Sequence, residues 1–155
     1  MYGTLIGIFL TSTGILIGAD TVLWDSGAPH STRIEKTCVS SQRSIAAFEG
    51  WYGERLSLQQ QFQAVCKTLA RSRKPVSIDE QADLLIRKLF DRYREQQAPG
   101  TTPAAAAPAP ANPHIAFVAV AGFDGATPIA AVRELRWEKT RKGRWNVTTA
   151  PVGKL

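Results

Sequence analysis

The fold of this chain is decided by its opening stretch, Gly3-Thr4-Leu5-Ile6-Gly7-Ile8-Phe9-Leu10-Thr11-Ser12-Thr13-Gly14-Ile15-Leu16-Ile17-Gly18-Ala19-Asp20. Two short runs rich in Ile and Leu flank the turn-forming cluster Thr11-Ser12-Thr13-Gly14, and this pattern predicts a pair of antiparallel strands. Neither run contains a charged residue, so each strand is apolar on both faces. Such strands must be covered above and below, as in the middle layer of a sandwich.

The length and composition of the chain are those of an ordinary globular protein. Its 155 residues are enough for one domain with a real hydrophobic core. Hydrophobic residues make up 44% of the sequence and charged residues 21%, which excludes a chain that is disordered throughout. No run is long enough for a membrane-spanning helix, and no basic residue precedes the N-terminal apolar run. We therefore expect a cytoplasmic protein that makes no contact with a membrane.

Further strands and helices are predicted in a regular order after the opening hairpin. Short apolar stretches bounded by loop residues indicate strands, and apolar residues at helical spacing indicate helices, the second of which begins at the capping box Ser77-Ile78-Asp79-Glu80. The loop Ser26-Gly27-Ala28-Pro29-His30-Ser31 precedes them. We expect strands near 33–39 and 44–49, helices over 58–71 and 77–93, a strand ending in a turn over 115–125, and a strand over 128–137.

The composition changes abruptly between residues 98 and 113, where Ala, Pro, Thr and Gly dominate. Five prolines in this segment prevent regular helix or strand, and small side chains cannot build a core. We therefore expect a flexible Ala/Pro-rich insertion at 98–113 within a single domain that spans residues 1–155.

Four residues in the first third of the chain are regularly spaced. Asp20 follows Thr4 by sixteen residues, Lys36 follows Asp20 by sixteen, and Gly50 follows Lys36 by fourteen. This series resembles the proteasome β-subunit family of N-terminal-nucleophile (Ntn) hydrolases. In that family a Gly-Thr bond is cut to expose a threonine, and an Asp, a Lys and a Gly follow at comparable spacing. The apolar strand that ends in Gly122-Phe123-Asp124, after two helices, is a second match.

The resemblance implies an α+β fold, an Ntn-hydrolase-like sandwich of antiparallel sheets with helices packed outside (αββα). It covers nearly all of this chain but about two-thirds to three-quarters of a typical member of the family. We therefore expect a sandwich that is incomplete at the C-terminus, without the later helices and strands of the family.

The resemblance also implies a catalytic site made of Thr4, Asp20, Lys36 and Gly50. A threonine hydroxyl is a poor nucleophile, but an N-terminal threonine can use its own α-amine as the general base. Lys36 would favour the developing alkoxide, and Asp20 would keep Lys36 charged and oriented. The backbone N–H of Gly50 would donate to the oxyanion. No cofactor and no metal is expected, because His30 has no second ligand at suitable spacing.

The function implied by the resemblance is that of a threonine-type peptidase active in proteolysis. Its substrates would be peptides or unfolded proteins, and it would act within a homo-oligomer or a ring of related subunits. An alternative is a catalytically inactive subunit of the same fold that serves in assembly or binding. Shifting the hairpin register by one residue would align Gly7 with a glycine of the family and displace Thr4 from the nucleophile position.

Two other features of the sequence leave alternatives open. The tail from residue 133 to 155 holds seven basic residues against two acidic ones, and it interleaves Trp137 and Trp145 with cations. It is interpreted as a solvated β-hairpin with its turn at 141–144, and a basic nucleic-acid-binding module is the less favoured alternative. Cys38 and Cys66 have no metal-ligand spacing, so we expect buried free thiols in a reducing compartment, and a disulfide is the less favoured alternative.

Overall fold

The fold is that of a computed structural model, which describes residues 6–20, 23–25, 28–31, 35–50, 57–72, 76–96, 113–142 and 145–154. The paired strands in this part of the chain are all antiparallel, and the protein is a mixed α+β protein, as the sequence predicts. Its elements are β1 (Ile6–Leu10), β2 (Ile15–Ala19), β3 (Leu23–Asp25), β4 (Ala28–Ser31), β5 (Thr37–Ser41), β6 (Ser44–Gly50), α1 (Ser57–Ala70), α2 (Ile78–Gln96), β7 (His114–Asp124), β8 (Thr127–Lys139) and β9 (Trp145–Lys154).

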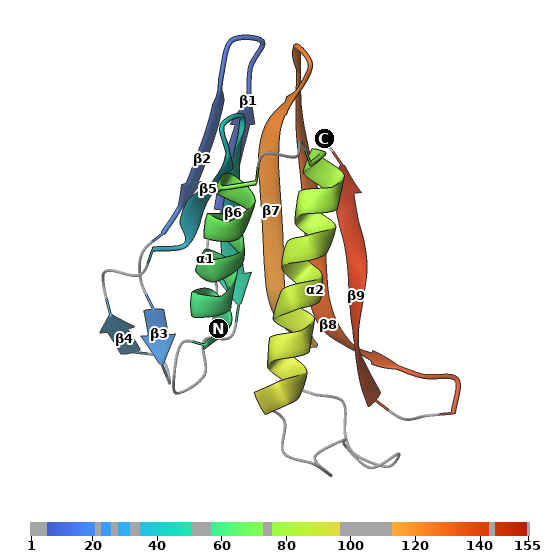
Figure 1. Ribbon diagram of the computed structural model, residues 1–155. Helices are drawn as coiled ribbons and strands as arrows, with labels where there is room; N and C mark the ends of the chain where they lie inside the picture. The colour runs from blue at the N-terminus through green and yellow to red at the C-terminus, as the bar shows by residue number, and fades with distance from the viewer. Residues whose placement is uncertain are drawn as a thin grey trace.

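A five-stranded sheet in the order β5-β6-β7-β8-β9 is the centre of the molecule (Figure 1). Each strand pairs with its neighbour in sequence, and the two helices are inserted between β6 and β7. The long strands β7 and β8 are joined by a tight turn at Gly125, whose φ of 62° favours glycine. The predicted hairpin in the basic tail is present as β8 and β9, with Arg141 and Lys142 exposed at its turn.

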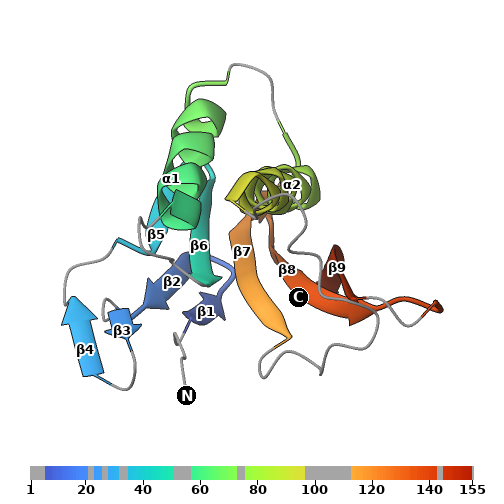
Figure 2. The ribbon, with the colours of Figure 1, turned by 90° about the horizontal axis from the view of Figure 1, so that it is seen from below.

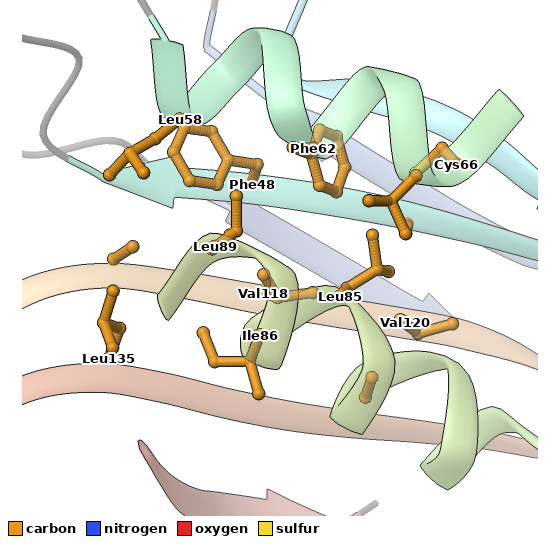
Figure 3. Packing of buried hydrophobic residues seen from close by; sticks show 14 of the residues in the cluster. Phe48, Leu58, Phe62, Cys66, Leu85, Ile86, Leu89, Val118, Val120 and Leu135 are labelled. Atoms are coloured by element: carbon orange, nitrogen blue, oxygen red, sulfur yellow. The ribbon is translucent and has the colours of Figure 1, made fainter. Parts of the chain in front are cut away.

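Both helices pack on the same face of this sheet (Figures 1 and 2). Their apolar stripes meet side chains of β6, β7 and β8, and together they form the hydrophobic core (Figure 3). Its largest fully buried apolar side chains are Phe48, Phe62, Leu58, Leu85, Leu89 and Leu135. The rings of Phe48 and Phe62 stack with their centroids 5.5 Å apart, so α1 is attached to β6 at the centre of the core.

The β1–β2 hairpin lies on the opposite face of the sheet from the helices (Figure 2). Its register pairs Ile6 with Ala19 and Leu10 with Ile15, and its turn is closed by the Thr11 side chain, which accepts from the Gly14 N–H at 2.9 Å. One face of the hairpin therefore packs against β5, β6 and β7, which gives three layers: helices, five-stranded sheet and hairpin.

The other face of the hairpin is exposed. Phe9 and Leu16 lie directly opposite each other on the two strands, and each is 64% exposed. The prediction that both faces are covered is therefore wrong for this outer face, because no described element packs on it. An apolar sequence pattern indicates what a strand can bury but does not supply the covering layer.

The structure corrects the predicted loop over residues 26–31. Ala28–Ser31 form β4, which pairs with β3 in a separate two-stranded sheet, and Pro29 lies opposite Trp24. A proline is tolerated here because a strand with one neighbour needs only half of its backbone donors for pairing. Of the predicted insertion at 98–113, only Pro113 lies within the described residues.

Candidate functional site

An ion pair between Lys36 and Asp20 lies at the junction of the hairpin and the five-stranded sheet. Lys36 Nζ donates to both carboxylate oxygens of Asp20, at 3.1 Å to Oδ1 and 3.2 Å to Oδ2. The Lys36 side chain is 1% exposed and the Asp20 side chain 31% exposed. Removing an ammonium group from water is unfavourable unless it is paired, so this pair keeps a positive charge inside the protein. The structure thus brings together two of the four predicted site residues.

The position of the pair follows from the two elements that carry it. Asp20 comes directly after β2, and Ala19 at the end of β2 lies opposite Ile6 at the start of β1. Lys36 comes directly before β5, where its carbonyl accepts from the Phe48 N–H at 2.8 Å. The entry to β1, the exit of β2 and the entry to β5 therefore meet at one end of the molecule.

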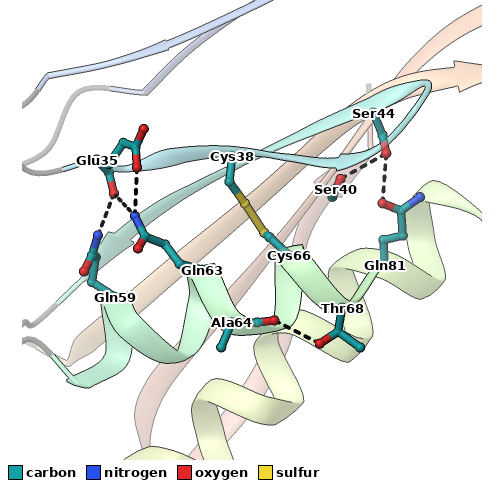
Figure 4. Close-up of a disulfide and its surroundings, with 10 residues drawn as sticks. All are labelled: Glu35, Cys38, Ser40, Ser44, Gln59, Gln63, Ala64, Cys66, Thr68 and Gln81. Atoms are coloured by element: carbon teal, nitrogen blue, oxygen red, sulfur yellow. Dashed lines mark hydrogen bonds between the residues drawn. A yellow bond between two sulfur atoms is a disulfide. The ribbon is translucent and has the colours of Figure 1, made fainter. Parts of the chain in front are cut away.

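Helix α1 holds the chain immediately before Lys36. The side chains of Gln59 and Gln63 both donate to the carbonyl oxygen of Glu35, at 2.8 Å and 3.3 Å (Figure 4). Gln63 also donates to the Glu35 carboxylate at 3.3 Å. Since that carbonyl belongs to the peptide bond that leads into Lys36, the two glutamines help to fix the lysine. Neither glutamine was predicted from the sequence, because helical periodicity indicates only the apolar stripe of this helix.

Gly50 lies at the end of β6, two residues beyond the Phe48 N–H that contacts Lys36. A side chain cannot be added here, since a Cβ would lie 2.8 Å from the Cβ of Ala116 and 3.0 Å from the carbonyl oxygen of Ile115. Close packing between β6 and β7 is therefore a sufficient reason for glycine. Its role as an oxyanion donor stays a prediction, and Thr4 lies outside the described residues.

Cys38 and Cys66 form a disulfide between β5 and α1, with Cα atoms 6.5 Å apart (Figure 4). The expectation of buried free thiols is therefore wrong. Spacing along the chain does not reveal this bond, because α1 lies over β5 and brings together two residues that are 28 positions apart. The signal lies in two local patterns: Cys66 has helical spacing from the buried Phe62 and Leu69, and Cys38 lies two residues before the buried Ser40 and so on the same face of β5.

Three further polar clusters lie away from the pair. Ser44 Oγ donates to Gln81 Oε1 at 2.9 Å inside the protein, and Ser40 shares a hydrogen bond with Ser44. Arg133 on β8 donates to Asp79 and Asp83 on α2. Burial lowers the pKa of the Arg133 guanidinium, but the hydrogen bonds that it donates to the carboxylates of Asp83 and Asp79 raise this pKa more, so it lies above its ordinary value.

The third cluster joins His114 Nδ1 to the buried carboxylate of Glu134, which also accepts from Arg136 at 3.5 Å. It does not touch the Lys36–Asp20 pair. Within the part of the chain that the structure describes, no group of three His, Cys, Asp or Glu side chains could hold a metal ion.

Comparison with known proteins does not assign the chain to a family. No protein-family model matches the sequence, and a search of curated proteins finds no match. Among the described residues, no helix is long and apolar enough to cross a membrane. The geometry of the site is therefore the basis for a functional proposal.

Proposed function

We propose that this protein is a threonine-type Ntn hydrolase that cleaves peptide bonds, with Thr4 as the nucleophile once it is the first residue. The observation that carries the proposal is the buried ammonium of Lys36, held by Asp20 at the entry to β1. A charged lysine in a site with little water stabilises a developing alkoxide far more strongly than an exposed lysine would.

Chain geometry allows Thr4 to reach this charge. Thr4 comes two positions before Ile6 in the sequence, and a step of two positions spans at most about 7 Å. Ile6 lies opposite Ala19, the residue before Asp20, so the chain enters β1 next to the carboxylate that holds Lys36. In the proposed reaction the α-amine of Thr4 takes the hydroxyl proton, the hydroxyl oxygen attacks the substrate carbonyl, and Lys36 lowers the free energy of the charged state.

The layer order also supports an Ntn-type sandwich. The helices cover one face of the five-stranded sheet and the β1–β2 hairpin lies on the other, which corresponds to the αββ part of an αββα arrangement. In this proposal the hairpin is the beginning of the second sheet. The peptide or unfolded-protein substrate would bind at the end of the hairpin where Asp20 and Lys36 lie.

The exposed outer face of the hairpin favours a second candidate, a catalytically inactive subunit of the same fold. Phe9 and Leu16 present an apolar surface that soluble proteins usually cover in an assembly. In that case the Lys36–Asp20 pair would serve only to join the hairpin to the sheet.

Two measurements on the purified protein distinguish these candidates. Intact-mass analysis should show that residues 1–3 have been removed, and a peptide epoxyketone should add covalently to Thr4. Thr4→Ala and Lys36→Met should both abolish the adduct, whereas Thr13→Ala, which alters an exposed threonine of the β1–β2 turn, should not. A mature protein that retains Met1 would exclude Thr4 as the nucleophile and leave the inactive subunit.

A further inference from the structure

One side of α1 contacts the chain just before and just after Lys36. Gln59, Gln63 and Cys66 are spaced four and three residues apart, so they share one face of the helix. Gln59 and Gln63 bind the carbonyl of Glu35, and Cys66 is bonded to Cys38 (Figure 4). These contacts lie on both sides of Lys36 in the sequence.

The main chain of Lys36 is thereby fixed between two elements. The peptide bond before it is held by α1 through the Glu35 carbonyl, and its own carbonyl is held by β6 through the Phe48 N–H. The position of the backbone determines where the buried Nζ atom ends, because the side chain extends from it to Asp20. A loosening of the segment 35–38 would therefore move the ammonium.

The disulfide is the one covalent bond in this set of contacts, since the chain has two cysteines. It attaches β5, which is only five residues long and lies at the edge of the five-stranded sheet. Among the described residues β5 and β9 are the two edge strands of this sheet, and β5 is the shorter of the two, so fewer strand contacts hold it in place. Cys66 is fully buried, whereas Cys38 is partly exposed and is the sulfur that a reductant can attack.

We propose that the Cys38–Cys66 disulfide controls the Lys36–Asp20 pair through the redox state of the protein. With the bond intact, α1 holds residues 35–38 and the ammonium of Lys36 is sheltered. After reduction, β5 separates from α1 more often and Lys36 becomes accessible to solvent. Water then hydrates the Lys36 ammonium, and the site no longer holds a sheltered positive charge. The effect on catalysis rests on the proposed function, but the effect on Lys36 does not.

The reduction itself is a balanced exchange with a dithiol. One thiolate of the reagent attacks Cys38 Sγ, and Cys66 Sγ leaves and takes a proton. The second thiol of the reagent then attacks the mixed disulfide, so the reagent is oxidised to its own disulfide and Cys38 is released as a thiol. Two electrons and two protons pass to the protein.

The test compares the acylation of lysines by N-hydroxysuccinimidyl acetate in the oxidised and the dithiothreitol-reduced protein, read by peptide mass spectrometry. We expect labelling of Lys36 to be slow in the oxidised protein and to increase about tenfold or more after reduction, as for a local opening. Labelling of Lys67, which is exposed on α1, should change less than about twofold, because its exposure does not depend on this opening. A variant with Cys38→Ala and Cys66→Ala should behave like the reduced protein with or without the reagent.

Amide hydrogen exchange separates this local effect from general unfolding. The Phe48 amide, which donates to Lys36, should exchange faster after reduction, whereas the amides of β7 should keep their protection. Unchanged labelling of Lys36 would overturn the proposal. So would a rise that is accompanied by equal loss of protection in β7, since the disulfide would then stabilise only the fold as a whole.

A pair of neighbouring glutamines supplies a control that leaves the disulfide intact. Gln59→Glu replaces the amide donor to the Glu35 carbonyl with an acceptor, and it should raise the labelling of Lys36 in the oxidised protein. Gln60→Glu makes the same change at an exposed position of the same helix and should have no effect. Equal effects of the two variants would contradict a positioning role for this face of α1.

The two proposals fail in different ways. If Met1 is retained, the hydrolase is excluded and the labelling experiment still decides the redox control. If Lys36 labelling does not respond to reduction, the redox control is excluded, and an epoxyketone adduct at Thr4 would still establish the hydrolase. If both hold, reduction should slow the formation of that adduct.

Discussion

The two faces of the five-stranded sheet carry apolar layers that differ in how completely they are covered. On the helix side, Phe48 and Phe62 are fully buried and stack between β6 and α1. On the hairpin side, β1 and β2 cover the sheet, but Phe9 and Leu16 on their own outer face are 64% exposed. The core on the helix side is buried, whereas the outer surface on the hairpin side is apolar and exposed to solvent.

This difference shows which part of the molecule supplies most of its stability. Burial of large apolar side chains is the main favourable term in folding, and most of it lies between the helices and the sheet. The hairpin is smaller and is joined to the sheet by packing on one face and by the Lys36–Asp20 pair. Functional sites are commonly found in such less stable regions.

The largest expected effect compares one phenylalanine on each side. Phe62→Ala removes a fully buried ring and leaves a cavity beside Phe48, which should lower the free energy of unfolding by about 3–5 kcal/mol. Phe9→Ala removes a ring that is mostly exposed to water and should change the free energy of unfolding by no more than about 0.5 kcal/mol. Denaturant unfolding of the two variants and the parent protein measures both values.

The contrast between the two sides is contradicted if Phe9→Ala lowers the free energy of unfolding as much as Phe62→Ala does. That result would mean that the outer face of the hairpin is covered in solution, and sedimentation of the parent and the variant would then show whether a second copy covers it. A small effect of Phe9→Ala with a monomeric parent protein agrees with the open surface described above.

The sequence predicts the two layers unequally well. Two apolar stripes, one with Phe62 in α1 and one with Leu85 in α2, predicted the helices and their buried faces, because helical periodicity reflects the local environment of each residue. The opening hairpin was predicted for the same reason, since its turn residues and strand pattern are local. Coverage of its outer face was predicted wrongly, because it depends on an element that must come from elsewhere in the fold.

In the candidate site, too, some contacts were predicted from the sequence and others were not. The spacing of Asp20 and Lys36 suggested their contact only through a resemblance, and the structure has that contact. Gln59 and the Cys38–Cys66 bond were not predicted, because they depend on which face of α1 lies over β5. Periodicity shows which residues of a helix are buried, but a hydrogen bond to one particular carbonyl depends on the register between two elements.

The second prediction concerns the connection between the two layers. Asp20→Asn removes the carboxylate that accepts from Lys36 Nζ and should lower the free energy of unfolding by about 2 kcal/mol, as for hydrogen bonds to charged groups. Asp91→Asn changes an exposed carboxylate on α2 and should stay within about 0.5 kcal/mol. Urea unfolding at constant ionic strength measures the two variants. Equal values would show that the Lys36–Asp20 pair does not hold the hairpin to the sheet.

The smallest expected effect is a pH dependence on the helix side, at Tyr93 of α2. Burial raises the pKa of the Tyr93 phenol above its ordinary value of about 10, and a hydrogen bond from Trp137 on β8 opposes this only in part. In the folded protein the phenol therefore keeps its proton at a pH where the unfolded chain has lost it. The stability from the neutral phenol is complete below pH 10 and is lost as the pH rises through the folded-state pKa.

Tyr93→Phe cannot ionise, so its stability should lack this alkaline decrease. The difference in unfolding free energy between the parent and Tyr93→Phe should be constant from pH 8 to about 10 and then fall by at most about 1.4 kcal/mol per pH unit, the limit for one proton. Urea unfolding at closely spaced pH values measures it, and other titrating groups cancel in the difference. Parallel curves up to pH 11 would mean that water reaches Tyr93, and the helix side would then be less completely sealed at its α2–β8 edge than the burial of Tyr93 indicates.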